Sequence, residues 1–283
     1  MTWSGASLYK SSDGSTYDTV LNVNNGAIIG QASTGLADFA GGNVFDHQNT
    51  VTVVLQTSGQ LTSYTQQQVL NGSGTFLLGG HGRWEVCQYT TATLTGTRTY
   101  TLSGLLRGRR GTEWAQGTHE VGDKFVFADV NSWRRVNPGT SEIGLSRQFK
   151  GVTFKQKLSD VVAQTFVNGA VGLKPYSPVH LTGSRDGSNN LTINWVRRTR
   201  IGGEWRDYVD VQYGEPTLSF DVEVWDSTYT TLLRTISAVS GVTTTYTAAE
   251  QASDGITPGN AVYLRVYQIS AVVGRGYKLQ GSV

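Results

Sequence analysis

The stretch LSGLLRGRRGTEW, residues 102–114, contains the features on which the fold assignment depends. An apolar strand pattern ends in a turn that is rich in glycine and arginine, and an acid and a tryptophan follow. We interpret it as a structural corner, in which arginine stems pack on aromatic rings and guanidiniums bind carboxylates such as Glu113 in bidentate pairs. The predicted structural motif consists of Arg107, Gly108, Arg109, Arg110, Gly111, Thr112 and Glu113.

Three phosphate-binding interpretations of this stretch fail on sequence grounds. Residues 108–111 spell the G-x-x-G of an RNA-clamping loop, but that loop needs helices on both sides and the neighbours here read as strands. A Walker loop needs Lys followed by Ser or Thr, and a helix after them. The glycines at 104, 108 and 111 also lack dinucleotide-fingerprint spacing. We therefore expect no specific nucleic-acid binding and no cofactor.

The composition favours an all-β protein. Among 283 residues there are 35 glycines and only 5 prolines, which suits short strands joined by tight turns. The formal net charge of +2 gives no strong overall field for polyanions. No apolar run approaches the roughly 18 residues that a membrane-spanning helix needs.

Apolar alternation predicts strands at residues 49–56, 74–79, 83–94, 98–106, 124–130 and 150–158, with a helical turn near 64–70. No sustained helical periodicity accompanies them. We therefore expect residues 1–172 to form a β-barrel or a distorted sandwich.

A second domain is expected after two closely spaced prolines, Pro175 and Pro178, which we interpret as a linker near residues 172–178. Short strands at about 181–188, 190–198, 218–226, 231–237, 243–249 and 261–272 suit a seven-stranded sandwich. Trp195 on an inward-facing position and Tyr263 after GITPGN resemble the tryptophan and tyrosine corner of fibronectin type III domains. We therefore expect residues 178–283 to be a fibronectin type III-like sandwich.

One segment of this second domain is a candidate contact surface. The residues are Arg197, Arg198, Arg200, Trp205, Arg206 and Tyr208, placed around Gly202-Gly203. Arginine and aromatic residues dominate interface hot spots, and loops on rigid sandwiches often carry binding. The alternative is a solvated hairpin whose arginines pair with its own acids.

The sequence offers no pattern for catalysis. The histidines His47, His81, His119 and His180 lie far apart, and we expect each to be solvated or capping a turn. Cys87, the single cysteine, is expected in the core. Asp13-Gly14 and Asp186-Gly187 read as hairpin turns and not as calcium loops. We therefore expect a protein that is not an enzyme and has no metal site.

A longer resemblance covers nearly the whole chain. LSGLLRGRRGTEWAQGTHEVGDKFVFAD, together with WSGASLYKSSDG, KPYSPVHL, INWVRRTRIGGEWRD and VYQISAVVGRG, resembles the C-terminal region of tail-tip or baseplate hub proteins of long-tailed bacteriophages and gene transfer agents.

This resemblance implies a structural virion protein at the distal end of the tail. Its partners would be other tail-tip or baseplate proteins, a tail fibre, and a host surface receptor or glycan, with threefold arrangement in the tail. The alternative is a carbohydrate-binding module or the binding part of a cell-wall hydrolase.

Overall fold

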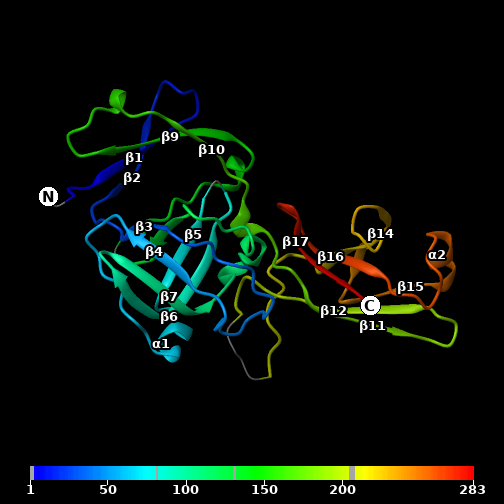
Figure 1. Cartoon of the computed structure of the whole chain (residues 1–283). Helices are drawn as coiled ribbons and strands as arrows, with labels where there is room; N and C mark the ends of the chain where they lie inside the picture. The colour runs from blue at the N-terminus through cyan, green and yellow to red at the C-terminus, as the bar shows by residue number, and fades with distance from the viewer. Residues whose placement is uncertain (1–2, 81, 130–131, 204–207) are drawn as a thin grey trace. The chain divides into compact units, whose positions relative to one another are not determined.

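The computed structural model describes residues 3–80, 82–129, 132–203 and 208–283 (Figure 1). The chain divides into two compact units, Met1–Gly169 and Ala170–Val283. Strands dominate both units, which confirms the predicted all-β class.

A closed six-stranded antiparallel barrel forms most of the first unit. Its strand order closes because β8 pairs with β5 on one side and with β3 on the other. The predicted barrel is therefore confirmed. In order around the barrel the strands are β3 (Ile29–Ala32), β4 (Val51–Leu55), β7 (Thr99–Leu106), β6 (Glu85–Gly96), β5 (Thr75–Gly79) and β8 (Lys124–Phe127).

Apolar side chains from all six strands fill the barrel interior. Phe76 packs against Phe125 and Tyr89, with ring centroids 5.3 and 5.9 Å apart. Cys87 is fully buried among them, as predicted, and burial raises the pKa of its thiol. The apolar residues that alternate along β6 and β7 therefore form part of the core, as the sequence pattern predicted.

A four-stranded sheet completes the first unit, in the order β10 (Gln164–Val167), β9 (Ser146–Thr153), β1 (Ala6–Ser11) and β2 (Asp18–Val23). Figure 1 shows this sheet apart from the barrel strands. Asp13 accepts hydrogen bonds from the Ser15 and Thr16 N–H groups in the β1–β2 turn, which confirms a hairpin there.

The helices of the first unit are short. The predicted helical turn is α1 (Gln66–Leu70), which begins with a capping box between Thr65 and Gln68. The 3₁₀ turns are η1 (Arg109–Gly111), η2 (Glu113–Ala115), η3 (Thr140–Glu142) and η4 (Leu158–Asp160).

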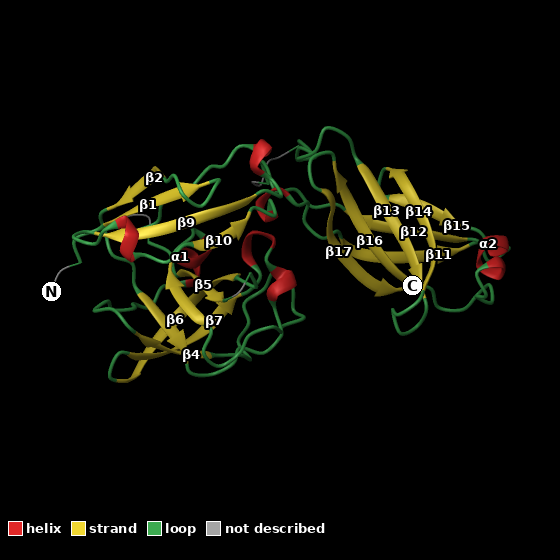
Figure 2. Cartoon of the chain, turned by 90° about the horizontal axis from the view of Figure 1, so that it is seen from above, coloured by secondary structure: helices red, strands yellow, loops and turns green. Residues whose placement is uncertain are grey.

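Within its described residues, the second unit is a fibronectin type III-like sandwich of seven strands. One sheet contains β11 (Val179–Arg185), β12 (Leu191–Val196) and β15 (Thr243–Tyr246). The other has the order β14 (Leu232–Ser240), β13 (Ser219–Trp225), β16 (Tyr263–Ser270) and β17 (Gly274–Ser282). The helix α2 (Ala248–Ser253) lies at one end of the strands (Figure 2).

The sandwich core contains Trp195, which is 2% exposed and packs edge-on against Phe220 at 5.2 Å between ring centroids. The hydroxyl of buried Tyr246 donates to Asp254 at 2.6 Å. In the described part of the chain, the Tyr263 hydroxyl makes no hydrogen bond to backbone; its ring instead packs edge-on against Tyr229. The inward position of Trp195 is confirmed, whereas the corner expected at Tyr263 is not formed.

The segment interpreted as a linker is packed against the sandwich. After the 3₁₀ turn η5 (Val171–Leu173), the Pro175 carbonyl accepts from the Tyr277 N–H at 3.0 Å, and the Ser177 hydroxyl donates to the Lys278 carbonyl at 2.8 Å. A Cβ on Gly276 would lie 2.6 Å from the Pro175 oxygen, so only glycine permits this approach. The expectation of an open linker at 172–178 is wrong, because these prolines are buried along β17.

We predict that a fragment comprising residues 170–283 is more stable than one that begins at Pro178. The shorter fragment loses two hydrogen bonds and the buried Pro175, a loss of about 2–4 kcal/mol in the free energy of unfolding. Urea unfolding of both fragments measures the difference. Equal stabilities would show that residues 170–177 are not part of the folded unit.

Candidate functional site

The predicted motif begins at the end of β7, where Arg107 binds a carboxylate in a bidentate pair. The Nε and Nη2 atoms of Arg107 donate to the two oxygens of Glu85, each at 2.9 Å, and both side chains are fully buried. Its Nη1 donates to the Ala37 carbonyl at 2.9 Å and lies 3.4 Å from Asp46. The predicted kind of contact, a bidentate arginine–carboxylate pair, is present at Arg107, and its carboxylate is Glu85.

Gly108 brings the backbone into the same contact. Its N–H donates to Glu85 Oε1 at 2.6 Å, and its φ of 57° lies in the left-handed region. A Cβ at this position would also lie 2.6 Å from Glu113 Cγ. Glycine is therefore required where the chain leaves β7.

The contact extends into a set of charged groups that we call the Glu85 network, of which all but the partly exposed Arg83 are buried: Arg83, Glu85, Arg107, His119 and Asp123. His119 lies between the two acids, with Nε2 2.6 Å from Glu85 Oε2 and Nδ1 3.0 Å from Asp123 Oδ2. Arg83 in turn forms a bidentate pair with Asp123 at 2.6 and 2.9 Å. The expectation that His119 is solvated or capping is wrong, because its side chain is fully buried.

Both ring nitrogens of His119 lie within hydrogen-bond distance of a carboxylate oxygen. Ionised carboxylates only accept hydrogen bonds, so both ring nitrogens of His119 must donate. With that ring charged, the three cations of the network balance Glu85, Asp123 and the neighbouring buried Asp46, which lies 3.4 Å from Arg107. Exposed Glu120, 3.4 Å from Arg83, lies outside this buried set. A buried network without net charge avoids the cost of an uncompensated ion.

The neighbouring charges keep both acids ionised. Burial alone would raise the pKa of Glu85, but hydrogen bonds from His119 and Arg107, the Arg107 charge and the Gly108 N–H lower it to about 2. Burial opposes ionisation of Asp123 as well. Hydrogen bonds from Arg83 and His119 outweigh that effect and lower its pKa.

The remaining motif residues have different environments. Arg109 donates to Gln88 at 3.0 Å and to Asn43 at 2.6 Å. The Thr112 hydroxyl accepts from the Val86 N–H at 2.9 Å, which ties the turn to β6. Arg110 is exposed and adopts a φ of 57°. Only Arg107 of the three arginines therefore lies in the buried network.

The candidate contact segment is held largely by its own loop. Arg197 pairs with Asp210 at 2.7 Å and Arg200 with Glu215 at 3.0 Å, while Arg198 lies over the Tyr176 ring. Tyr208 is fully exposed. Trp205 and Arg206 lie outside the described residues.

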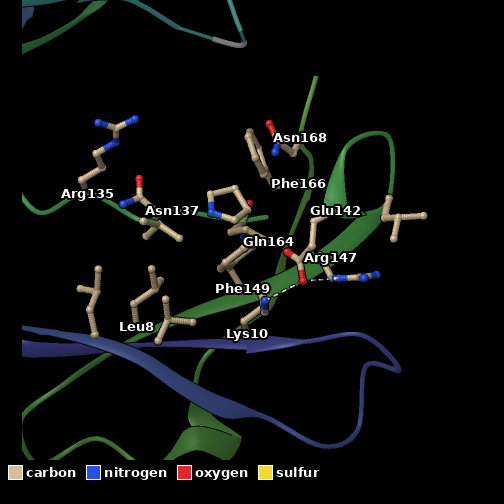
Figure 3. Close-up of a pocket in the computed structure, with 15 residues that line it drawn as sticks. Leu8, Lys10, Arg135, Asn137, Glu142, Arg147, Phe149, Gln164, Phe166 and Asn168 are labelled. Carbon is tan, nitrogen blue, oxygen red and sulfur yellow. Dashed lines mark hydrogen bonds and ion pairs between the residues drawn. The ribbon is translucent and has the colours of Figure 1, made fainter. Parts of the chain in front are cut away.

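A groove that the sequence did not indicate lies on one face of the sheet β10-β9-β1-β2, with a volume of about 660 Å³ (Figure 3). Leu8, Leu21, Phe149 and Phe166 form its apolar wall, and residues 135–138 pass along it. At its rim Glu142 binds Lys10 at 2.8 Å and lies 3.6 Å from Arg147. We call it the Phe149 groove.

In the ranges that the structure describes, no group of three or more His, Cys, Asp or Glu side chains could hold a metal ion. Within the same ranges no helix has the length and apolar character to span a membrane.

Residues 27–126 match the family described as Rcc01698-like, C-terminal. This match includes the barrel strands, except for the last residue of β8, and all five residues of the Glu85 network. No curated protein matches the chain.

Solved structures similar to the chain include the FN5 domain of Drosophila Lar (12% identity, 38% of this chain and 94% of that one, TM-score 0.25). Domains d3-d4 of rat CD45 match at 14% identity, over 55% of this chain and 70% of that one, with a TM-score of 0.29. The chicken CNTN1 FN1-FN3 domains match at 6% identity, over 99% and 88%, with a TM-score of 0.26. The strand order, β11-β12-β15 in one sheet and β14-β13-β16-β17 in the other, defines the sandwich of the second unit.

We predict that Arg107→Lys and Arg110→Lys differ sharply, although the substitution is the same. Lysine cannot reproduce the bidentate contact with Glu85, so Arg107→Lys should lower the free energy of unfolding by about 2–4 kcal/mol. Arg110 is exposed, and its replacement should change stability by less than about 0.5 kcal/mol. Thermal and urea unfolding measure both. Equal effects would refute the assigned role of Arg107.

We also predict a specific acid sensitivity. The pKa of Glu85 is lower in the folded state than its ordinary value of 4.5, so its contribution is complete above that value and is lost as the pH falls toward 2. Glu85→Gln should be about 3–5 kcal/mol less stable at pH 7, because it leaves Arg107 and His119 without their counter-charge. It should also lose less stability than the wild type between pH 5 and pH 2.5. Parallel unfolding curves against pH would contradict this.

Proposed function

We propose that this protein is a non-enzymatic structural component of the distal tail of a long-tailed phage or gene transfer agent particle. In this proposal the chain contributes to the tail tip or baseplate hub and contacts neighbouring tail proteins and the host surface. Its assembled state would be threefold, and its location would be the distal end of the virion tail.

The observation that carries the proposal is the coincidence of the family match with the barrel. Residues 27–126 match the Rcc01698-like C-terminal family, and the same residues contain the run LLRGRRGTE that resembles tail-tip hub proteins. Arg107 of that run binds Glu85 of β6 within the barrel unit. This use of arginine and acid side chains supports an architectural role for the barrel.

The chemistry of the Glu85 network is consistent with that role. Its two carboxylates are contacted by arginine, histidine and backbone N–H groups at distances of 2.6–3.2 Å. A carboxylate that acts as a general base must be able to accept a proton near the operating pH. The low pKa of Glu85, about 2, makes it a poor base at neutral pH.

Immunogold electron microscopy of purified particles from the source bacterium tests the proposal. Antibody raised against the full chain should label one site per particle, at the end of the tail opposite the capsid. A strain in which the gene is deleted serves as the control and should show no label. Label on the capsid, or protein recovered only free of particles, would contradict the proposal and favour the carbohydrate-binding alternative.

A further inference from the structure

The Phe149 groove has the features of a preformed binding site. We propose that it binds an extended acidic segment of a partner protein, with a large apolar side chain in the groove and a neighbouring carboxylate at Arg135. The proposal concerns this groove alone and does not depend on the proposed function.

The apolar wall of the groove is accessible to solvent. Phe149 and Phe166 meet edge-on with ring centroids 6.2 Å apart, and Leu8 and Leu21 face each other across β1 and β2. Phe166 is 57% exposed and Leu145, also in the lining, is 43% exposed. A pocket of this size and lining can remove a large apolar side chain from water.

The rim of the groove is positively charged. The groove lining contains Lys10, Arg135 and Arg147 and a single carboxylate, Glu142, which gives a local net charge of +2. Glu142 is engaged by Lys10 and Arg147, whereas the exposed guanidinium of Arg135 contacts no carboxylate among the described residues. Charge complementarity therefore favours an anionic partner.

The sheet edge next to the groove favours a polypeptide over a lipid. Strand β10 pairs with β9 on one side, and within the described ranges no strand pairs with its other side. All four of its residues are exposed, and a bridge from Ile143 occupies only Asn168 beyond its end. An open strand edge can be completed by the backbone of an extended peptide, which an acyl chain cannot do.

The test is a selection from a library of random twelve-residue peptides on the immobilised full chain. Enriched peptides should carry Asp or Glu within two residues of a large apolar side chain. Fluorescence anisotropy of the best peptide should show binding that Arg135→Glu weakens at least about tenfold. Phe166→Asp should weaken it similarly, because it places a charge in the groove.

Matched variants control for general effects. Arg134→Glu changes a neighbouring exposed arginine that does not line the groove, and Val167→Asp changes the next edge position. Both should bind within about twofold of the wild type, and circular dichroism should show that all four variants are folded.

Three results would overturn the proposal. The first is an enriched set without acids, or no enrichment at all. The second is a peptide that binds Arg135→Glu as tightly as the wild type. The third is evidence that the groove binds something other than a peptide. Binding of dodecanoate in the groove without peptide enrichment would show this, and so would self-association of the chain that Phe166→Asp abolishes.

Discussion

The buried carboxylate of Glu85 holds together the charged residues at the ends of β6 and β7. It accepts hydrogen bonds from two atoms of Arg107, from the Gly108 N–H and from His119, all within 2.6–2.9 Å. An ionised carboxylate in a core is costly unless its oxygens are satisfied, and here four donors satisfy them. An ionised Glu85 requires the positive charges of Arg107 and His119 beside it. At position 108 the narrow space next to Glu113 requires glycine.

The network also connects strands that close the barrel. Glu85 is the first residue of β6, Arg107 follows β7, and Asp123 directly precedes β8, which pairs with both β3 and β5. Ala32 of β3 exchanges backbone hydrogen bonds with Gly122 and Asp123 at 2.9 and 2.8 Å. The charged cluster thus holds the loop before β8 against the ends of β6 and β7. Of the arginines in the run 102–114, Arg107 is the one that contributes to this charged cluster at the end of the barrel.

Much of the barrel could be predicted from the sequence, because apolar and polar residues alternate along β4, β5, β6 and β7 and the apolar ones fill the barrel core. Five strands were missed, since short segments or segments such as GRGYKLQGS have only a weakly apolar face: β1, β2, β3, β10 and β17. The bidentate arginine contact could be predicted in kind, but its partner could not, because Glu85 lies 22 residues from Arg107 and only the β6–β7 pairing brings them together. The Phe149 groove depends in the same way on segments far apart in sequence. The family resemblance indicated a structural role, which stays a proposal.

Nitrogen NMR of the His119 ring at pH 7 tests the central claim most directly. If Glu85 and Asp123 are both ionised and both accept from the ring, the spectrum must show two protonated ring nitrogens with slowly exchanging N–H groups. The Asp123→Asn variant identifies the Nδ1 signal, because it alters that partner alone. A single ring N–H, typical of a neutral tautomer, would contradict the charge balance of the Glu85 network.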